Sequence, residues 1–416
     1  MCTSKACSAK GSCVTTQPIR TVGVGGFEVT PEARDAVIAV LESGRLSYGP
    51  VTKEFETTFA RDHSLRFAAF CNSGTSALHV ALQALKILHG WQDGDEVIVP
   101  AVTFVATSNI VIHNNLTPVF VDVEWGRYGL DPALLEAAIT PRTRAIIPVH
   151  LFGQACDMRP IMEIARRHNL RVLEDSCETM YATYEGQSVG SFGDASAFST
   201  YAAHVLVTGV GGLACSNRPE VAQLMRSLLN HGRDGIYIAI DDDQVEGHAL
   251  KEVVARRFRF EHVGHSFRAT EMEAALGVVQ LRHAAELVGR RRAIAARLTE
   301  GLARFGERLI LPTVQPGSEH SFMMYPIVTG PGVDRDALTF YLEEHGVETR
   351  QMMPLTNQPI YERLWPGIEG RYPVAREINR RGFYIGSHPA MSIDDADYVV
   401  GVFGDCFAGA PNASKS

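Results

Sequence analysis

Between residues 66 and 175, short apolar segments alternate regularly with stretches of helical periodicity, and this alternation limits the possible folds more than any other property of the chain. The apolar segments are RFAAF (66–70), EVIVP (96–100), TPVFVDV (117–123), RAIIPVH (144–150) and RVLED (171–175), and the helical stretches fall near 75–88, 104–114, 131–138 and 158–169. Such alternation predicts an α/β fold with a mostly parallel sheet that helices cover on both faces. Ligands of such sheets bind at the carboxyl ends of the strands, so reactive residues are expected in the loops that follow them.

The rest of the chain predicts a second, smaller domain of α+β type. From residue 268 the sequence is strongly helical, and we expect the basic run at 290–292 to lie on a solvated helix face. Apolar segments at 307–312 and 321–328 and helical segments at 334–345 and near 392–403 follow. We therefore expect a flexible tail over 1–20, a large domain over 21–295 and a small C-terminal domain over 296–416.

Charge and hydropathy exclude several classes of partner. The 416 residues carry 39 Lys and Arg against 47 Asp and Glu, a net charge of −8, which is the wrong sign for a protein that neutralises nucleic-acid backbones. No apolar stretch approaches the roughly 18–20 residues of a membrane span, and the N-terminal MCTSKACSAKGSC lacks the apolar core of a secretory signal. We expect a cytoplasmic protein that binds neither nucleic acid nor a membrane.

The eight cysteines are too sparse for a disulfide framework, so reduced thiols are expected. Cys2, Cys7 and Cys13 form a loose cluster, but zinc and iron–sulfur sites usually contain tighter C-x2-C pairs. For these residues a flexible tail is favoured over a metal site, and no metal centre is expected elsewhere.

Six segments resemble, in order and spacing, the DegT/DnrJ/EryC1/StrS family of pyridoxal-phosphate (PLP) sugar aminotransferases. They are CNSGTSALHVAL (71–82), VPAVTFVATSNI (99–110), VHLFGQACDM (149–158), LEDSCE (173–178), GSFGDASAFSTYAAH (190–204) and TGVGGLACSN (208–217). The resemblance covers roughly residues 20 to 400. It implies the fold-type I, aspartate aminotransferase-like fold for the large domain, and a homodimer whose active sites lie at the subunit boundary.

The segment Ser73–Ser76 joins a predicted strand to a predicted helix, where main-chain amides and hydroxyls can hold a phosphate. A serine or threonine after a strand is also a common helix cap, so this pattern alone is weak. The resemblance implies that Thr75, Ser76 and Ser199 contact the cofactor phosphate.

Four further cofactor contacts are implied by the resemblance. Asp175 closes a strand, where a carboxylate can keep the cofactor's pyridine nitrogen protonated, although a strand-end aspartate is often only a turn cap. Phe104 stands where the family stacks an aromatic ring on the cofactor, and its alternative is an ordinary core position. Glu178 replaces the glutamine that many members carry near the phenolic oxygen. Ser266 stands where many members have an asparagine that reaches the partner subunit's phosphate.

The decisive position is His204, where the family's aminotransferases carry the lysine that binds the cofactor covalently. The chain has only six lysines, none of them in this segment: Lys5, Lys10, Lys53, Lys86, Lys251 and Lys415. Imidazole cannot make a stable imine, but its pKa near neutrality suits general acid–base catalysis. A core histidine in a decayed family member is the alternative.

The same replacement marks a subgroup of the family, the 3-dehydratases of nucleotide-linked 4-keto-6-deoxyhexoses, which SCETM (176–180) and GFYIGSHP (382–389) also resemble. After His204 only Cys215 and Cys406 remain, too few for the four-thiolate cluster of one dehydratase branch, so the resemblance is to the cluster-free, colitose-pathway type. It implies pyridoxal or pyridoxamine 5′-phosphate as cofactor, an amino donor such as glutamate, and His204 as the base. An aminotransferase of a keto-sugar or cyclitol and a non-catalytic scaffold are the alternatives.

Overall fold

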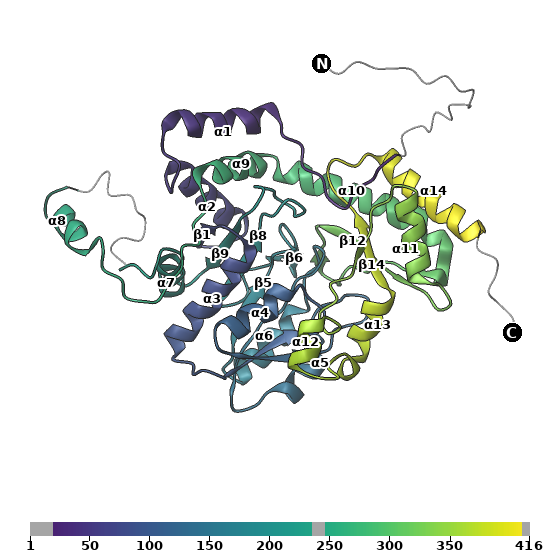
Figure 1. Ribbon diagram of the computed structural model, residues 1–416, viewed down its shortest axis with the longest axis horizontal. Helices are drawn as coiled ribbons and strands as arrows, with labels where there is room; N and C mark the ends of the chain where they lie inside the picture. The colour runs from purple at the N-terminus through teal and green to yellow at the C-terminus, as the bar shows by residue number, and fades with distance from the viewer. Residues whose placement is uncertain (1–19, 235–245, 410–416) are drawn as a thin grey trace, which may run out of the picture.

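The computed structural model describes residues 20–234 and 246–409. The central sheet and its helices form a large domain, and a smaller domain with the strands labelled β12 and β14 lies beside it (Figure 1). Except for Arg20, the predicted N-terminal tail, with Cys2, Cys7 and Cys13, lies outside the described residues.

Seven strands form the central sheet in the order β1-β9-β8-β5-β4-β2-β3. Their bounds are β1 Phe67–Cys71, β2 Glu96–Pro100, β3 Thr117–Val121, β4 Thr143–Ile146, β5 Arg171–Asp175, β8 Ala195–Ser199 and β9 Gly212–Ser216. The neighbours from β8 to β3 pair in parallel, whereas β9 is antiparallel to both β8 and β1. The mostly parallel sheet is confirmed, and the predicted strand at 144–150 is shorter than expected.

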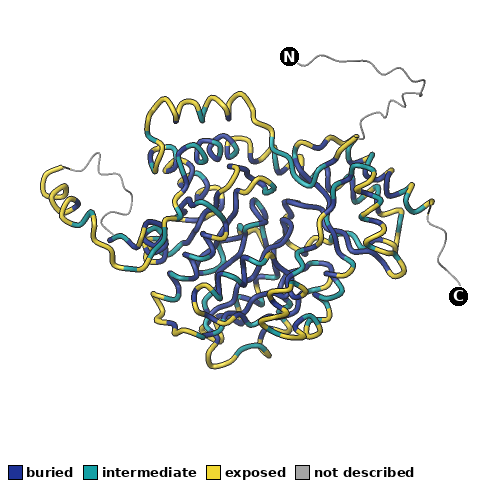
Figure 2. Tube along the Cα trace, in the orientation of Figure 1, coloured by how far each residue is buried: buried dark blue, intermediate teal, exposed yellow. Residues whose placement is uncertain are grey.

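Side chains of the central strands alternate between two apolar cores, because successive residues of a strand point to opposite faces. Val97 and Val99 belong to the core that includes α3 (Gly74–His89) and α7 (Pro219–Leu229), whereas Ile98 belongs to the core that includes α5 (Pro132–Leu135) and α6 (Met158–Arg167). The strands are accordingly buried inside the large domain (Figure 2). Burial on both faces explains why these strands are continuous apolar runs.

Local sequence signals set the helix ends. In α3, the Ser73 side chain accepts a hydrogen bond from the Ser76 amide, and Gly90 ends the helix in the left-handed region at φ 63°. The other helices of the large domain are α1 Pro31–Ser43, α2 Pro50–Asp62, α4 Val105–His113, α8 Gly247–Arg256 and α9 Glu271–Arg282, and η1 Glu136–Ala138 is a 3₁₀ turn. The helices predicted at 31–43, 75–88, 104–114 and 158–169 are confirmed to within a few residues.

The small domain has a sheet of order β10-β12-β14-β13, which is antiparallel throughout. Its strands are β10 Leu309–Ile310, β12 Met324–Thr329, β13 Arg350–Gln351 and β14 Gly382–Gly386. The helices of this part of the chain are α11 Arg335–Glu344, α12 Pro359–Leu364, α13 Pro373–Arg381 and α14 Ile393–Gly409. Two short 3₁₀ segments are η3 Ala303–Arg308 and η4 Glu369–Arg371. A third small sheet pairs β6 Thr183–Tyr184 with β7 Gln187–Ser188 and β11 Ser318–Glu319. The α10 helix (Ala284–Leu302) runs through the predicted boundary at 295/296, and Ile294 and Leu298 pack in the small-domain core.

The expectation that the basic run at 290–292 is solvated is wrong for its middle residue. Arg290 is exposed, but Arg291 is only 2% exposed. Arg291 falls three residues after Val288 and three before Ile294, so it occupies the buried stripe of α10. A charged residue therefore lies where the helical period places an apolar one.

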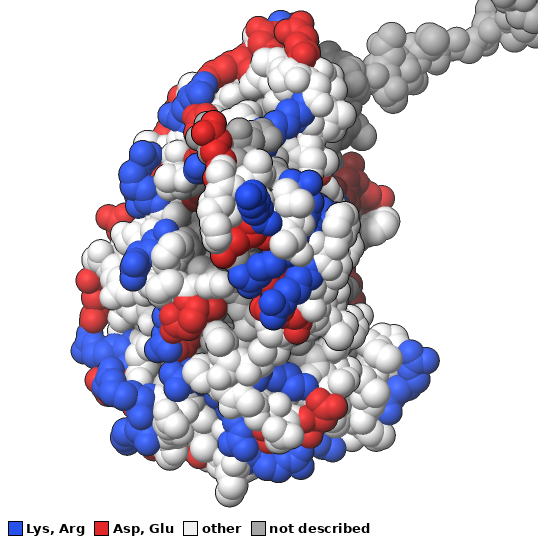
Figure 3. Space-filling model, turned by 90° about the vertical axis from the view of Figure 1, so that its left-hand side faces the viewer, with Lys and Arg blue, Asp and Glu red and all other residues white. Residues whose placement is uncertain are grey.

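Among the described residues, no helix combines the length and hydropathy that a membrane crossing needs. Figure 3 shows Lys and Arg side chains interspersed with Asp and Glu on one face of the molecule. On that face positive charge is not gathered into a single patch.

Candidate active site

A cavity of about 390 Å³ lies where the carboxyl ends of β5 and β8 meet residues of the small domain. It brings together six of the eight site residues expected from the sequence: Thr75, Phe104, Asp175, Glu178, Ser199 and His204. Met323, Met324, Met353 and Tyr384 line it from the small-domain side. Segments far apart in the sequence thus meet at the edge of the sheet where ligands were expected.

The turn into α3 forms one end of the cavity. Ser73 caps the helix, and its hydroxyl also donates to Ser76 Oγ at 3.0 Å. A Cβ on Gly74 would lie 2.7 Å from Cβ of Ser199, so glycine is required for β8 to approach this turn. The helix N-terminus and the Thr75 and Ser199 hydroxyls therefore converge on a place that suits a phosphate.

Asp175 is a buried carboxylate that forms no ion pair within 4 Å among the described residues. Its Oδ2 accepts a hydrogen bond from Thr107 Oγ1 at 2.7 Å, and its Oδ1 accepts one from the Cys177 amide at 3.1 Å. Burial raises the pKa of this carboxyl. A protonated pyridine nitrogen would supply the missing positive charge, so the residue fits the role expected for it.

Phe104 is the N-cap residue of α4 and is 58% exposed, although most phenylalanines are buried. Its ring lines the cavity instead of joining the core. The core alternative considered from the sequence is therefore wrong. An aromatic face at this position can stack on a planar ligand.

Glu178 is 7% exposed and accepts a hydrogen bond from the Phe152 amide at 3.2 Å. Burial raises its pKa to about 8, and the nearby Asp175 charge acts in the same direction. The carboxyl is therefore protonated near neutral pH, where it can donate a hydrogen bond as a glutamine amide does.

This raised pKa makes a testable prediction about stability. Between about pH 4.5 and 8 the folded chain keeps a proton that the unfolded chain has lost, so the stability contributed by this group falls as the pH rises. Glu178→Gln is expected to match the native protein near pH 5 and to exceed it by about 1–4 kcal/mol above pH 8. Urea denaturation at several pH values measures this difference. The exposed Glu163→Gln is the control, and equal curves for Glu178→Gln and the native protein at alkaline pH would contradict the prediction.

His204 lies on the hairpin loop that joins β8 to β9. The loop is closed at its base because the Thr200 amide donates to Gly211 O at 3.0 Å and the Thr208 amide donates to Thr200 O at 2.9 Å. Nδ1 of His204 is buried and has no partner among the described residues. Burial, and next the positive charge of Arg291, lower the pKa of His204 to about 4. The imidazole is therefore neutral near pH 7 and can accept a proton.

No described lysine lines this cavity. Lys53 and Lys251 are exposed on α2 and α8, and Lys86 pairs with Asp93 and donates to Asn114 O. Lys5, Lys10 and Lys415 lie outside the described residues. Within the described chain, His204 thus stands in the cavity without a competing amine.

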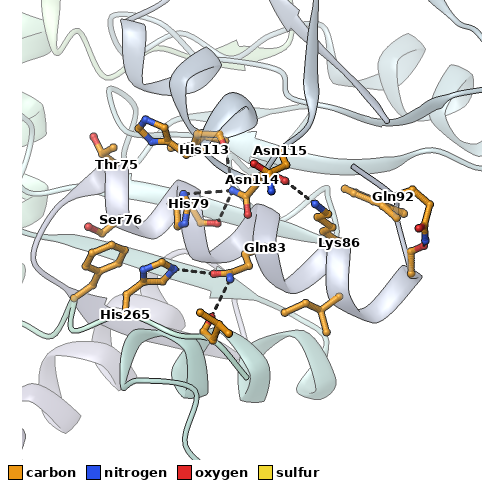
Figure 4. Close-up of a pocket in the computed structure, with 16 residues that line it drawn as sticks. Thr75, Ser76, His79, Gln83, Lys86, Gln92, His113, Asn114, Asn115 and His265 are labelled. Carbon is orange, nitrogen blue, oxygen red and sulfur yellow. Dashed lines mark hydrogen bonds between the residues drawn. The ribbon is translucent and has the colours of Figure 1, made fainter. Parts of the chain in front are cut away.

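A second cavity, of about 810 Å³, begins at Thr75 and Ser76 and continues along α3 (Figure 4). Its polar lining includes His79, whose ring lies 4.8 Å from that of His265, and Gln83, whose Oε1 accepts a hydrogen bond from His265 Nε2 at 3.0 Å. Ser76 therefore faces this second space and lies next to the first. Ser266 lines neither cavity, and its hydroxyl accepts a hydrogen bond from Arg268 at 3.2 Å. Its expected contact, with a partner subunit, stays a prediction.

Sequence reasoning missed Thr107, Tyr384 and Arg291. Thr107 lies in the first turn of α4, four residues after Thr103 in the preceding loop, a spacing that could have indicated the contact between their hydroxyls. Tyr384 lies in the segment GFYIGSHP, where the resemblance implied no role for it. The helical spacing of Arg291 between Val288 and Ile294 indicated its burial, but its contacts come from distant segments.

The model of the DegT/DnrJ/EryC1/StrS aminotransferase family matches residues 28–403. The chain is 37% identical to a GDP-perosamine synthase of Caulobacter vibrioides over 91% of this chain and 96% of that protein. It is 34% identical to a dTDP-4-dehydro-2,6-dideoxy-D-glucose 3-dehydratase of Saccharopolyspora spinosa, over 92% and 85% of the two chains.

Among solved structures, the E. coli GDP-4-keto-6-deoxy-D-mannose-3-dehydratase with bound hydrated PLP superposes with a TM-score of 0.80, over 92% of this chain and 99% of that one. The two chains are 24% identical, so this likeness concerns the fold. It agrees with the fold-type I expectation from the sequence.

Proposed function

The chain belongs to the DegT/DnrJ/EryC1/StrS aminotransferase family, whose members are PLP-dependent enzymes of sugar modification, and from this premise we propose that it removes the C3 hydroxyl of a nucleotide-linked 4-keto-6-deoxyhexose. One observation carries the proposal. His204 lines a cavity that no described lysine reaches, and the sequence resemblance puts this residue where family aminotransferases carry the covalent lysine. A site without that amine keeps a base for proton transfer but lacks the covalent anchor.

The residues of the cavity would hold the cofactor noncovalently. Thr75, Ser76 and Ser199 would bind its phosphate, Phe104 would stack on its ring, and Asp175 would keep its pyridine nitrogen protonated. Glu178, protonated near neutral pH, would donate a hydrogen bond to the phenolic oxygen. In its pyridoxamine form the cofactor supplies an amine that condenses with the C4 ketone and a ring that takes up electrons.

His204 acts as the base in this proposal. Its neutral imidazole would take a proton from the carbon that bears the cofactor's amine, and the electron pair left behind would shift through that amine toward the sugar and expel the C3 hydroxyl. Hydrolysis then releases a 3-deoxy-4-keto sugar and ammonia, and an amino donor such as glutamate restores the amine form. The cavity's mostly apolar wall, with Met323, Met324 and Met353, limits the access of water during proton transfer.

A homodimer is part of the proposal. Ser266 lies outside the cavity of its own chain, as expected for a residue that reaches a partner subunit's phosphate. The second cavity opens beside Thr75 and Ser76, at the phosphate end of the proposed cofactor site.

The second candidate is amination of the ketone carbon, with His204 as proton carrier and no covalent anchor. The 37% identity to a GDP-perosamine synthase favours it. The two reactions differ in product: one loses a hydroxyl and releases ammonia, and the other retains the hydroxyl and gains an amine.

The test incubates the purified protein with pyridoxamine 5′-phosphate, glutamate and a panel of nucleotide-linked 4-keto-6-deoxy sugars, with mass spectrometry of the sugar and an ammonia assay. Loss of one water from the sugar together with ammonia release is the expected result. An aminated sugar would support the second candidate instead. Absence of cofactor absorbance after incubation with either cofactor form would contradict both reactions and favour a non-catalytic scaffold.

A further inference from the structure

Arg291 is a buried arginine that has no carboxylate partner among the described residues. It is 2% exposed, and its guanidinium donates hydrogen bonds of 2.8 Å to the main-chain carbonyls of Met323, Ser387 and His204. Its Nε has no hydrogen-bond partner among the described atoms. Burying a charge without a counter-charge is costly, and an apolar side chain would fill this face of α10 at a lower free energy. The charge is therefore a candidate for a functional role.

The three carbonyls belong to segments that surround the candidate active site. Met323 lies just before β12 and lines the cavity, and Ser387 follows β14. Ser387 also donates its hydroxyl to the Arg291 carbonyl at 3.2 Å, so this contact is reciprocal. Through one planar guanidinium, the hairpin loop of His204 is tied to the two central strands of the small-domain sheet.

The guanidinium also sets the electrostatic surroundings of His204. Its positive charge lowers the pKa of the imidazole, in the same direction as burial. The other titratable groups around the cavity are Tyr201 on the same hairpin, Asp175, Cys177 and Glu178 after β5, and Tyr384 on β14. His388, after β14, is close enough to Arg291 for the guanidinium to lower its pKa as well. Burial and, after it, the Arg291 charge are therefore the two influences that set the protonation of His204, and both oppose a charged imidazole.

We propose that Arg291 is a positioning residue for His204: its planar fork, bonded to the His204 carbonyl and to the carbonyls of Met323 and Ser387, fixes the main chain of the hairpin, and its buried charge acts on the imidazole. The inference rests on the proposed function, because proton transfer at His204 is what both effects serve. It adds a residue outside the cofactor contacts to the machinery of the site. The two effects are separable, because lysine keeps the charge without the fork and glutamine keeps amide donors without the charge.

The test follows the titration of His204 by NMR of the histidine-labelled protein without cofactor or substrate, with the signal assigned by its loss in His204→Asn. The native His204 is expected to titrate well below its ordinary range. In Arg291→Gln its midpoint should rise by about 1–2 pH units, from Coulomb's law at an effective dielectric near 20. In Arg291→Lys the midpoint should stay low, while kcat falls by about tenfold or more with KM little changed, because the carbonyl of His204 is no longer held.

The matched control is Arg290→Gln, which removes the same charge from the exposed neighbouring position of α10 and should leave the titration unchanged. A midpoint in Arg291→Gln equal to the native one would overturn the inference, whatever the sugar assay shows. If the sugar assay shows no reaction, the proposed function is wrong, but the His204 titration can still be measured because it needs neither cofactor nor substrate. If Arg291→Gln does not fold, Arg291→Lys decides, because an unchanged kcat in that variant would overturn the positioning role.

Discussion

Replacing His204 by asparagine is expected to lower the turnover of the sugar reaction by about 10²–10⁴-fold while the protein still binds the cofactor. Asparagine has similar size and polarity, but its amide cannot accept and release a proton near neutral pH. The proposed cofactor contacts, from the turn into α3, Phe104 and Asp175, do not involve the imidazole. Binding and turnover should therefore separate in this variant.

Cofactor absorbance after gel filtration measures binding, and single-turnover mass spectrometry of the sugar measures the reaction. The control is His168→Asn, at an exposed position beyond the end of α6, which should keep full turnover. Unchanged turnover in His204→Asn would remove this residue from the mechanism. His204→Lys provides a second check, because an amine at this position should link covalently to the cofactor aldehyde and survive borohydride reduction. Failure to form that link would indicate that the side chain points away from the aldehyde.

The largest expected loss of stability comes from Glu56, which lies in α2 at 5% exposure. Its carboxylate accepts hydrogen bonds from both terminal nitrogens of Arg226 at 3.1 and 2.9 Å and from the Phe70 amide at 2.7 Å. Glu56→Ala would leave the Arg226 charge and the β1 amide without this partner inside the large domain. We expect a loss of about 3–5 kcal/mol, the range found when one partner of a buried ion pair is removed.

Urea denaturation followed by far-ultraviolet circular dichroism measures this loss. The control is Glu54→Ala, two residues earlier on the same helix, where the carboxylate is 53% exposed and lies 3.6 Å from Arg282. An exposed pair of this kind contributes about 1 kcal/mol or less. Equal denaturation curves for the two variants would contradict the assignment of Glu56 as a buried stabilising contact.

The alternation of apolar and helical segments predicted the strands from β1 to β5, because strands buried on both faces are continuous apolar runs. It did not predict β8 and β9, ASAFS and GLACS, which are built from small residues. The structure gives the reason: a Cβ on Gly212 would lie 2.5 Å from the carbonyl of Ser73, so these strands must be small to admit the turn into α3. In β8 and β9, close packing against the turn into α3 requires small residues, so the continuous apolar run that marks a buried strand is absent.

The candidate site was predicted where its residues close strands or begin helices, as Asp175 and Thr75 do, because such positions meet at one edge of a parallel sheet. The contacts of Arg291 could not be predicted, since its partners Met323 and Ser387 are separated from it by 32 and 96 residues. The raised pKa of Glu178 likewise depends on burial that only the assembled fold creates. The sequence identified His204 as the candidate for the reacting position, and the assembled fold supplied its electrostatic setting.

The hairpin that carries His204 is held at its base by bonds between Thr200, Thr208 and Gly211, beside strands that pair independently of the residues between them. Val205 and Leu206 anchor the end of this loop in the hydrophobic core, so residues 201–204 can diversify while the surrounding sheet keeps its register. An ancestral scaffold of this kind could exchange one reaction for another through a few codon changes in a single loop, without rebuilding its hydrophobic interior.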